Sequence, residues 1–143
     1  MMAKLSVEVV SAERIVFTGE ANMVVAPGSL GVLGILPKHA PLLTSLSPGV
    51  LRIQQDEGEV VLAVSGGFLE VSNDRVEVLT DAAERAEEID LARAEEARRR
   101  AEHVLEEQPR GRGTEWEAAE AALRRSLARL KAAELRGRRA QRR

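Results

Sequence analysis

The chain has 143 residues, of which 44% are hydrophobic and only 2% aromatic, with a formal net charge of −2 and no cysteine. This length fits one compact domain, or one small domain with an appendage, whose core is built from Val, Leu, Ile and Ala. The lack of cysteine excludes disulfides, thiolate metal sites and cysteine nucleophiles. His39 and His103 are far apart in the sequence, so we expect no metal site.

Charge is unevenly distributed along the chain. Residues 81–143 hold 16 of the 21 Lys and Arg residues, whereas residues 1–80 are sparsely charged and acidic. This break predicts two structural parts, and the net charge argues against general nucleic-acid binding.

The longest uncharged run, residues 21–37, contains Gly and Pro residues that a membrane-spanning helix tolerates poorly. No secretory signal is visible, so we expect a soluble protein.

The first part of the chain has the period-2 alternation of β-strands, which is clear in Lys4–Val10. Similar segments follow, separated by turn-forming residues such as Gly66-Gly67 and Asn73-Asp74. No helical pattern intervenes. The sequence therefore predicts a β-sandwich of about ten short, mainly antiparallel strands, ending near Thr80.

The second part has the period of amphipathic helices. The first predicted helix covers roughly Glu88–Glu107, and Gln108–Gly113 then breaks it with one Pro and two Gly. The second helix is expected to begin at Thr114, in a capping box with Glu117, and to stop at Gly137. The short linker predicts an antiparallel helical hairpin, followed by a basic tail.

We place the boundary between an N-terminal sandwich domain and a C-terminal hairpin at residues 1–84 and 85–143. The apolar stripe of the first helix is expected to be Ala94, Ala97, Ala101, Val104 and Leu105. That of the second is expected to be Trp116, Ala119, Leu123, Leu127 and Leu130. Because buried alanine contributes little apolar area, we expect the hairpin to be weakly held and able to open.

Two segments of the first part carry a family resemblance. They are "APGSLGVLGILPKHAPLLTSLSPGVLRI" (Ala26–Ile53) and "SGGFLEVSNDRVEVLTD" (Ser65–Asp81). In combination they resemble the bacterial-type epsilon subunit of F-type rotary ATP synthases, and the similarity extends over essentially the whole chain. That family also has a β-sandwich followed by a helical hairpin.

The resemblance implies a non-catalytic subunit in the central stalk of the rotor of a proton-translocating ATP synthase. In that family the sandwich binds the gamma subunit and rests on the c-subunit ring. The hairpin either folds on the sandwich or extends toward the alpha and beta subunits of the catalytic head, where it blocks ATP hydrolysis. The implied location is peripheral, on the cytoplasmic face of the bacterial cell membrane, with membrane contact only through the complex.

One loop departs from the family pattern. Leu30 and Val32 stand where acidic residues are common, and Lys38 stands where Gly is common. We expect this loop to face the c ring or gamma, and an apolar pair at a loop tip suits such an interface. His39 has no nucleophile or carboxylate partner in sequence reach, so we assign it to the interface or to structure rather than to catalysis.

The resemblance also implies a regulatory ATP site in the folded hairpin, because Ile89–Ala94 matches the family motif I/L-D-x-x-R-A. The residues implied are Glu84, Ile89, Asp90, Arg93, Ala94, Arg100, Arg125 and Arg129. Residues 93 and 100 are seven apart and so lie on the same side of a helix, and residues 125 and 129 are four apart and share a face. The hairpin could therefore bring four guanidiniums together around phosphate. ATP would then favour the folded hairpin, with no cofactor required.

Other interpretations stay open. Asp90–Arg93 and Glu96–Arg100 also fit exposed ion pairs of a solvated helix. A stand-alone ATP-sensing module would use the same residues, and a basic-helix nucleic-acid binder is a more distant third class. The sequence has no GxxxxGK[ST] motif, so we expect no ATP hydrolysis by the chain itself and no catalytic residue.

Overall fold

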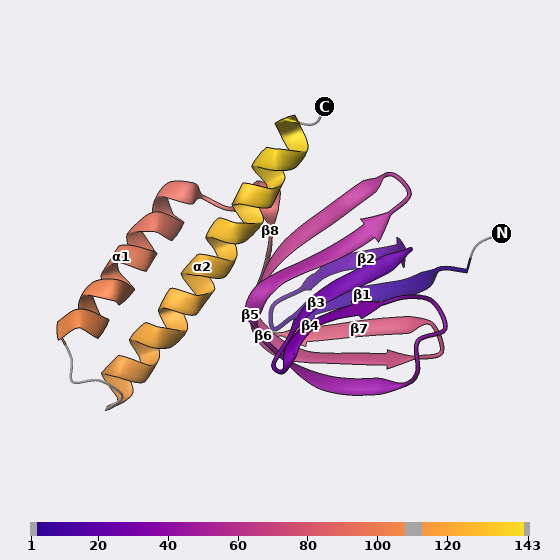
Figure 1. Ribbon diagram of the computed structural model, residues 1–143, viewed down its shortest axis with the longest axis horizontal. Helices are drawn as coiled ribbons and strands as arrows, with labels where there is room; N and C mark the ends of the chain where they lie inside the picture. Colours follow the sequence, from indigo (N-terminus) through magenta and orange to yellow (C-terminus); the bar gives the residue numbers. More distant parts are fainter. Residues whose placement is uncertain (1–2, 108–112, 142–143) are drawn as a thin grey trace.

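The computed structural model describes residues 3–107 and 113–141, with side chains as far as residue 136. Strands come first and two helices follow (Figure 1). The strands are β1 (Leu5–Ser11), β2 (Ile15–Ala21), β3 (Met23–Gly28), β4 (Gly31–Ile35), β5 (Leu42–Gln55), β6 (Gly58–Ser72), β7 (Arg75–Thr80) and β8 (Ala83–Arg85). A 3₁₀ turn, η1 (Ala86–Glu88), leads to α1 (Leu91–Glu107) and α2 (Thr114–Gln141).

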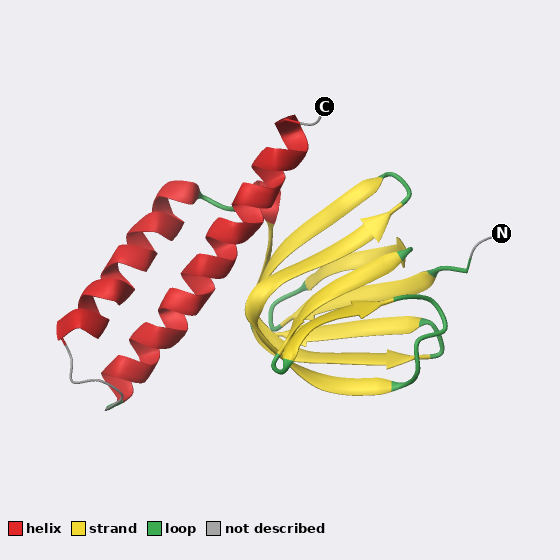
Figure 2. Ribbon diagram, in the orientation of Figure 1, coloured by secondary structure: helices red, strands yellow, loops and turns green. Residues whose placement is uncertain are grey.

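The strands form one sheet in the order β2-β1-β7-β6-β5-β3-β4, with β8 also pairing with β6. Neighbours are antiparallel except β1 and β7, which run parallel. The sheet bends over itself into two facing layers (Figure 2), which confirms the predicted sandwich. Its core is aliphatic apart from Phe17, and Leu5, Leu51, Ile53, Leu62 and Leu69 are fully buried.

Two long strands make the bend, and here the prediction of about ten short strands was wrong. The described residues form eight strands, because β5 and β6 have 14 and 15 residues and pair along nearly their whole length. Gly66 and Gly67 lie inside β6 rather than in a turn between two strands. Their φ angles of +105° and +119° bend the strand locally. Residues with a Cβ rarely adopt such positive φ angles.

The helical hairpin is confirmed, but its details differ from the prediction. α1 begins at Leu91 rather than Glu88, because residues 86–88 form the 3₁₀ turn. The N–H of Glu117 donates to the carbonyl of Gly113 in place of the expected capping box. Gly137 lies within α2, because a single Gly among strong helix formers costs only about 1 kcal/mol. The expected break at residues 108–112 lies outside the described residues.

α2 lies between α1 and the sandwich (Figure 1). A small apolar cluster joins α2 to the sandwich. It contains Val61 and Ala63 of β6, Ala86 and Ile89 between β8 and α1, and Ala132 and Ala133 of α2. Between the helices, the predicted alanines Ala94, Ala101 and Ala119 are buried. Leu127, predicted to lie in the apolar stripe, is 48% exposed, because the buried face of α2 passes through Ser126 and Ala128 instead.

We predict that Gly67→Ala destabilises the sandwich by more than about 2 kcal/mol. A Cβ at Gly67 would lie 2.0 Å from the carbonyl oxygen of Leu79, in addition to the strain of its positive φ. Gly31→Ala is the matched control, because Gly31 also has a positive φ of +135° but no atom within 4 Å of a built Cβ. Urea unfolding of both variants measures the difference, and equal losses of stability would contradict the prediction.

Candidate functional site

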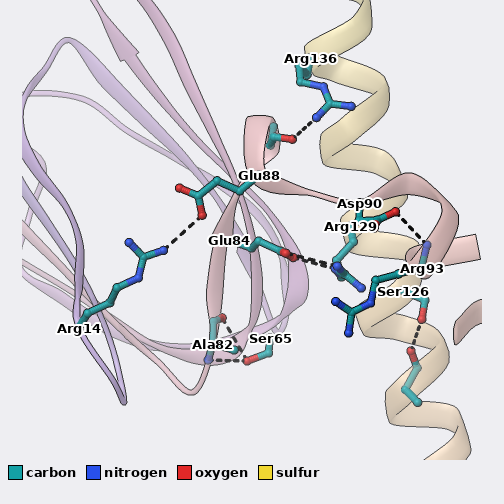
Figure 3. Close-up of polar contacts among 12 residues, drawn as sticks. Arg14, Ser65, Ala82, Glu84, Glu88, Asp90, Arg93, Ser126, Arg129 and Arg136 are labelled. Carbon is teal, nitrogen blue, oxygen red and sulfur yellow. Dashed lines mark hydrogen bonds and ion pairs between the residues drawn. The ribbon is translucent and has the colours of Figure 1, made fainter.

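The connection between the sandwich and the hairpin, residues 84–88, is held by arginines from two sides (Figure 3). From α2, Arg129 donates to both carboxylate oxygens of Glu84, at 2.7 Å and 3.3 Å. Arg136 of α2 donates to the carbonyl oxygen of Ala86 at 2.5 Å. These contacts attach α2 to the last strand and to the turn that follows it.

The sandwich holds the same connection. Arg14, in the turn between β1 and β2, pairs with Glu88 at 3.3 Å. Arg85 donates to the carbonyl oxygen of Val16 at 3.1 Å, and its guanidinium lies 5.9 Å from the centre of the Phe17 ring. The connection is therefore anchored to the sandwich independently of α2.

The motif Ile89–Ala94 forms the entry to α1. Asp90 caps the helix, because its Oδ1 accepts a hydrogen bond from the N–H of Arg93 at 3.2 Å. The Ile89 and Ala94 side chains are buried. The Arg93 side chain is exposed and extends from α1 toward α2 in Figure 3. The motif thus has a structural role of its own, in starting the helix.

A pocket of about 440 Å³ lies between the sandwich and α2. Three of the predicted ATP-site residues line it: Glu84, Arg125 and Arg129. Its floor is formed by backbone and small side chains of residues 63–65 and 82–83, where Ser65 exchanges hydrogen bonds with the backbone of Ala82. The size falls within the roughly 300–1,000 Å³ typical of small-molecule sites.

Arg100 lies apart from this pocket. It lines a second groove, between α1 and α2, among alanines and Val104. Its guanidinium is 3.5 Å from Glu96, and both side chains are 68% exposed. Nearby, hydrogen bonds from Arg98 to Glu95 and Glu102 hold the pKa of that guanidinium above its usual value. This part of α1 has the ion pairs of a solvated helix face, and the four predicted guanidiniums do not all line one pocket.

The predicted interface residues lie at the two ends of β4: Leu30 and Val32 are at the β3–β4 turn, and Lys38 and His39 are in the loop between β4 and β5. Leu30 is at the tip of the β3–β4 hairpin and is fully exposed, and Val32 is 76% exposed. Lys38 has a positive φ of +70°, and its N–H donates to Asp74 at 2.5 Å. The ring of His39 bonds the carbonyl oxygen of Ala40 at 2.7 Å. Lys38 and His39 thus shape the loop between β4 and β5.

Sequence reasoning missed a second apolar surface. Phe68 and Leu79 lie directly opposite each other on β6 and β7, and they are 57% and 54% exposed. The alternation of the two strands, which puts Leu69 and Val78 in the core, was the signal that would have placed these two outside. This pair leaves apolar area exposed on the outer face of β6 and β7.

Two family models cover nearly all of the chain. The beta-sandwich domain of the ATP synthase delta/epsilon chain matches residues 4–86, and the long alpha-helix domain of the same chain matches residues 87–134. This chain belongs to the ATP synthase delta/epsilon chain family. Its curated members are ATP synthase epsilon chains, so this chain is a subunit of the ATP synthase complex rather than an enzyme on its own.

Two curated family members are similar over nearly their full length. The chain is 53% identical to the ATP synthase epsilon chain of Moorella thermoacetica, over 92% of this chain and 98% of that one. It is 52% identical to the epsilon chain of Dehalococcoides mccartyi strain BAV1, over 94% of this chain and 96% of that one. The match therefore includes both the sandwich and the hairpin.

Solved structures share the fold of this family member. A chain in the cryo-EM structure of the Euglena gracilis mitochondrial ATP synthase (OSCP, F1 and c-ring) aligns with a TM-score of 0.80 and 22% identity, over 93% of this chain and 82% of that one. A chain in the central stalk and c-ring structure from Tetrahymena thermophila aligns with a TM-score of 0.58 and 16% identity, over 92% of this chain and 97% of that one.

None of the helices in residues 3–107 and 113–141 is long and apolar enough to cross a membrane. Within the same residues, no group of His, Asp and Glu side chains is arranged to hold a metal ion.

We predict that Glu84→Gln loosens the hairpin without unfolding the sandwich. The Glu84–Arg129 pair is bidentate and about two-thirds buried, so its loss should lower the free energy of local opening by about 1 kcal/mol, or about fivefold in the opening equilibrium. Hydrogen exchange of the α2 amides should accelerate by that factor, while exchange of the β6 amides stays constant.

Glu77→Gln is the matched control, because Glu77 forms an ion pair with Arg75 within β7, away from the hairpin. Its α2 exchange rates should equal those of the unchanged chain. An unchanged α2 in Glu84→Gln, or equal acceleration in the control, would show that the Glu84–Arg129 pair does not hold the hairpin.

Proposed function

We propose that the chain is a regulatory rotor subunit whose hairpin switches between a folded position on the sandwich and an extended position. In the extended position the two helices reach the alpha and beta subunits of the catalytic head and inhibit ATP hydrolysis. The observation that carries the proposal is the contrast between the aliphatic core of the sandwich and the alanine-rich contact beneath α2.

The energetics of the two contacts support a switch. A buried alanine methyl contributes about 0.8 kcal/mol, whereas a buried Leu, Ile or Val side chain contributes about 1.5–3 kcal/mol. The sandwich core consists mainly of the larger side chains, and the contact with α2 includes four alanines. Release of α2 is therefore far less costly than unfolding of the sandwich, and the sandwich can stay assembled while the hairpin moves.

In this proposal the sandwich makes the permanent contacts. The exposed tip with Leu30 and Val32, together with the loop of Lys38 and His39, meets the c ring or the gamma subunit. Burial of these apolar side chains, and of Phe68 and Leu79, against partner subunits would remove them from water. The subunit would then sit peripherally at the cytoplasmic face of a bacterial membrane, and touch the membrane only through the complex.

We further propose that ATP binds to the folded hairpin as a regulatory ligand. Glu84, Arg125 and Arg129 line the pocket between α2 and the sandwich, and guanidinium groups there suit phosphate oxygens. Arg93 and the motif Ile89–Ala94 lie at the neighbouring start of α1. A ligand that binds only the folded hairpin would favour it by differential affinity, so high ATP would oppose inhibition.

We predict that deletion of residues 88–143 raises ATP hydrolysis by the assembled ATP synthase severalfold, because the inhibitory segment is removed. The measurement is ATPase activity of purified complexes with the full or the shortened chain. Co-purification of the shortened chain with gamma is the control for assembly, since residues 3–87 retain the core of the sandwich. Unchanged hydrolysis in an intact complex would overturn the inhibitory role and leave the family membership untouched.

A further inference from the structure

One arginine of the pocket between the sandwich and α2 has no part in the ATP site that the sequence suggested. Arg14, in the turn between β1 and β2, lines the pocket from the sandwich, whereas Arg125 and Arg129 line it from α2. We propose that Arg14 is a further phosphate-binding residue for the nucleotide. This inference rests on the proposed ATP site and adds to it a contact that belongs to the sandwich.

The charges of the pocket leave room for an anion. Three guanidiniums and two carboxylates line it, so their formal charges sum to +1. Glu84 is paired with Arg129, and Glu88 is paired with Arg14. Arg125 forms no hydrogen bond or ion pair with any other side chain in the part of the chain that the structure describes. A phosphate group entering the pocket would thus find one guanidinium without a partner and two with carboxylate partners.

The two paired arginines differ in how firmly they are held. Arg129 makes two hydrogen bonds to Glu84, and its side chain is 27% exposed. Arg14 makes a single contact of 3.3 Å to Glu88, and the two side chains are 53% and 48% exposed. Exposed pairs of this kind change an equilibrium by less than about fivefold. Arg14 can therefore exchange Glu88 for a phosphate oxygen at little cost, since a phosphate group accepts the same two hydrogen bonds from the guanidinium fork as a carboxylate does.

Because Arg14 belongs to the sandwich, a ligand bound by it would connect the sandwich to α2. Arg14 is attached to the sandwich through β1 and β2, whereas Arg125 is attached to α2. A phosphate chain held by both would connect the two parts of the protein directly. The ligand would then stabilise the folded position through a contact that opening must break, in addition to any contact within the hairpin.

Calorimetric titration of the full chain with ATP tests the inference. Arg14→Gln is expected to weaken ATP binding about tenfold, as is Arg125→Gln, because each removes a charged hydrogen bond to phosphate. Arg75→Gln is the matched control, since Arg75 is an exposed arginine in an ion pair elsewhere on the sandwich, and it should leave affinity unchanged. Unchanged affinity in Arg14→Gln, with loss in Arg125→Gln, would overturn the Arg14 contact and leave the ATP site in place.

A second variant separates ligand binding from a purely structural role. If Arg14 binds phosphate, Glu88→Gln frees it from its ion pair and should strengthen ATP binding about threefold, and this gain should shrink when Arg14→Gln is also present. If Arg14 only anchors the connection, Glu88→Gln breaks the same anchor and weakens binding. The inference would be overturned if Glu88→Gln weakened ATP binding. It would also be overturned if Glu88→Gln strengthened ATP binding equally in the presence of Arg14 and in the Arg14→Gln variant. Absence of heat from the unchanged chain at millimolar ATP would remove the proposed ATP site itself.

Discussion

A bidentate ion pair between Glu84 and Arg129 joins the hairpin to the sandwich. Glu84 belongs to the last strand of the sandwich and Arg129 to the middle of α2, and their two hydrogen bonds join the two parts of the chain at a site that is only partly open to water. Around this pair the apolar contact is small and rich in alanine. A polar contact therefore helps to set the position of α2 on the sandwich, where the apolar interface is small. A ligand with suitable polar groups can replace such a contact.

The arginines on the connection also indicate where a moving hairpin would pivot. Arg14 and Arg85 fix residues 85–88 to the sandwich, and neither contact involves α2. Movement of the hairpin would break the contacts made by Arg129 and Arg136 and leave these two in place. The pivot then falls at Ile89 and Asp90, directly before α1. Ile89 is buried against the alanines of α2 in the folded position, so it would lose that cover on opening.

Local sequence signals predicted the parts of the structure that local interactions determine. Alternation in the strands, the Asn73-Asp74 turn and the helical periods all correspond to observed elements. Gly66-Gly67 could not be interpreted in the same way, because only pairing with β5 distinguishes a bend within a strand from a turn between strands. In the site, Glu84, Arg125 and Arg129 were suggested by resemblance to a family. Arg14 was not, because its neighbours in the pocket are about 50 residues or more away in the sequence.

The distance between the sandwich and the hairpin shows whether the Glu84–Arg129 ion pair and ATP hold the hairpin on the sandwich. The chain has no cysteine, so Thr18→Cys on β2 and Glu106→Cys on α1, both exposed, would give one spin-labelled pair. With ATP, the distance distribution by pulsed electron paramagnetic resonance should have one dominant short component. Without ATP, and more so in Glu84→Gln, a longer component should grow. A single distribution that neither ATP nor Glu84→Gln changes would contradict a hairpin held by this ion pair and by a ligand beside it.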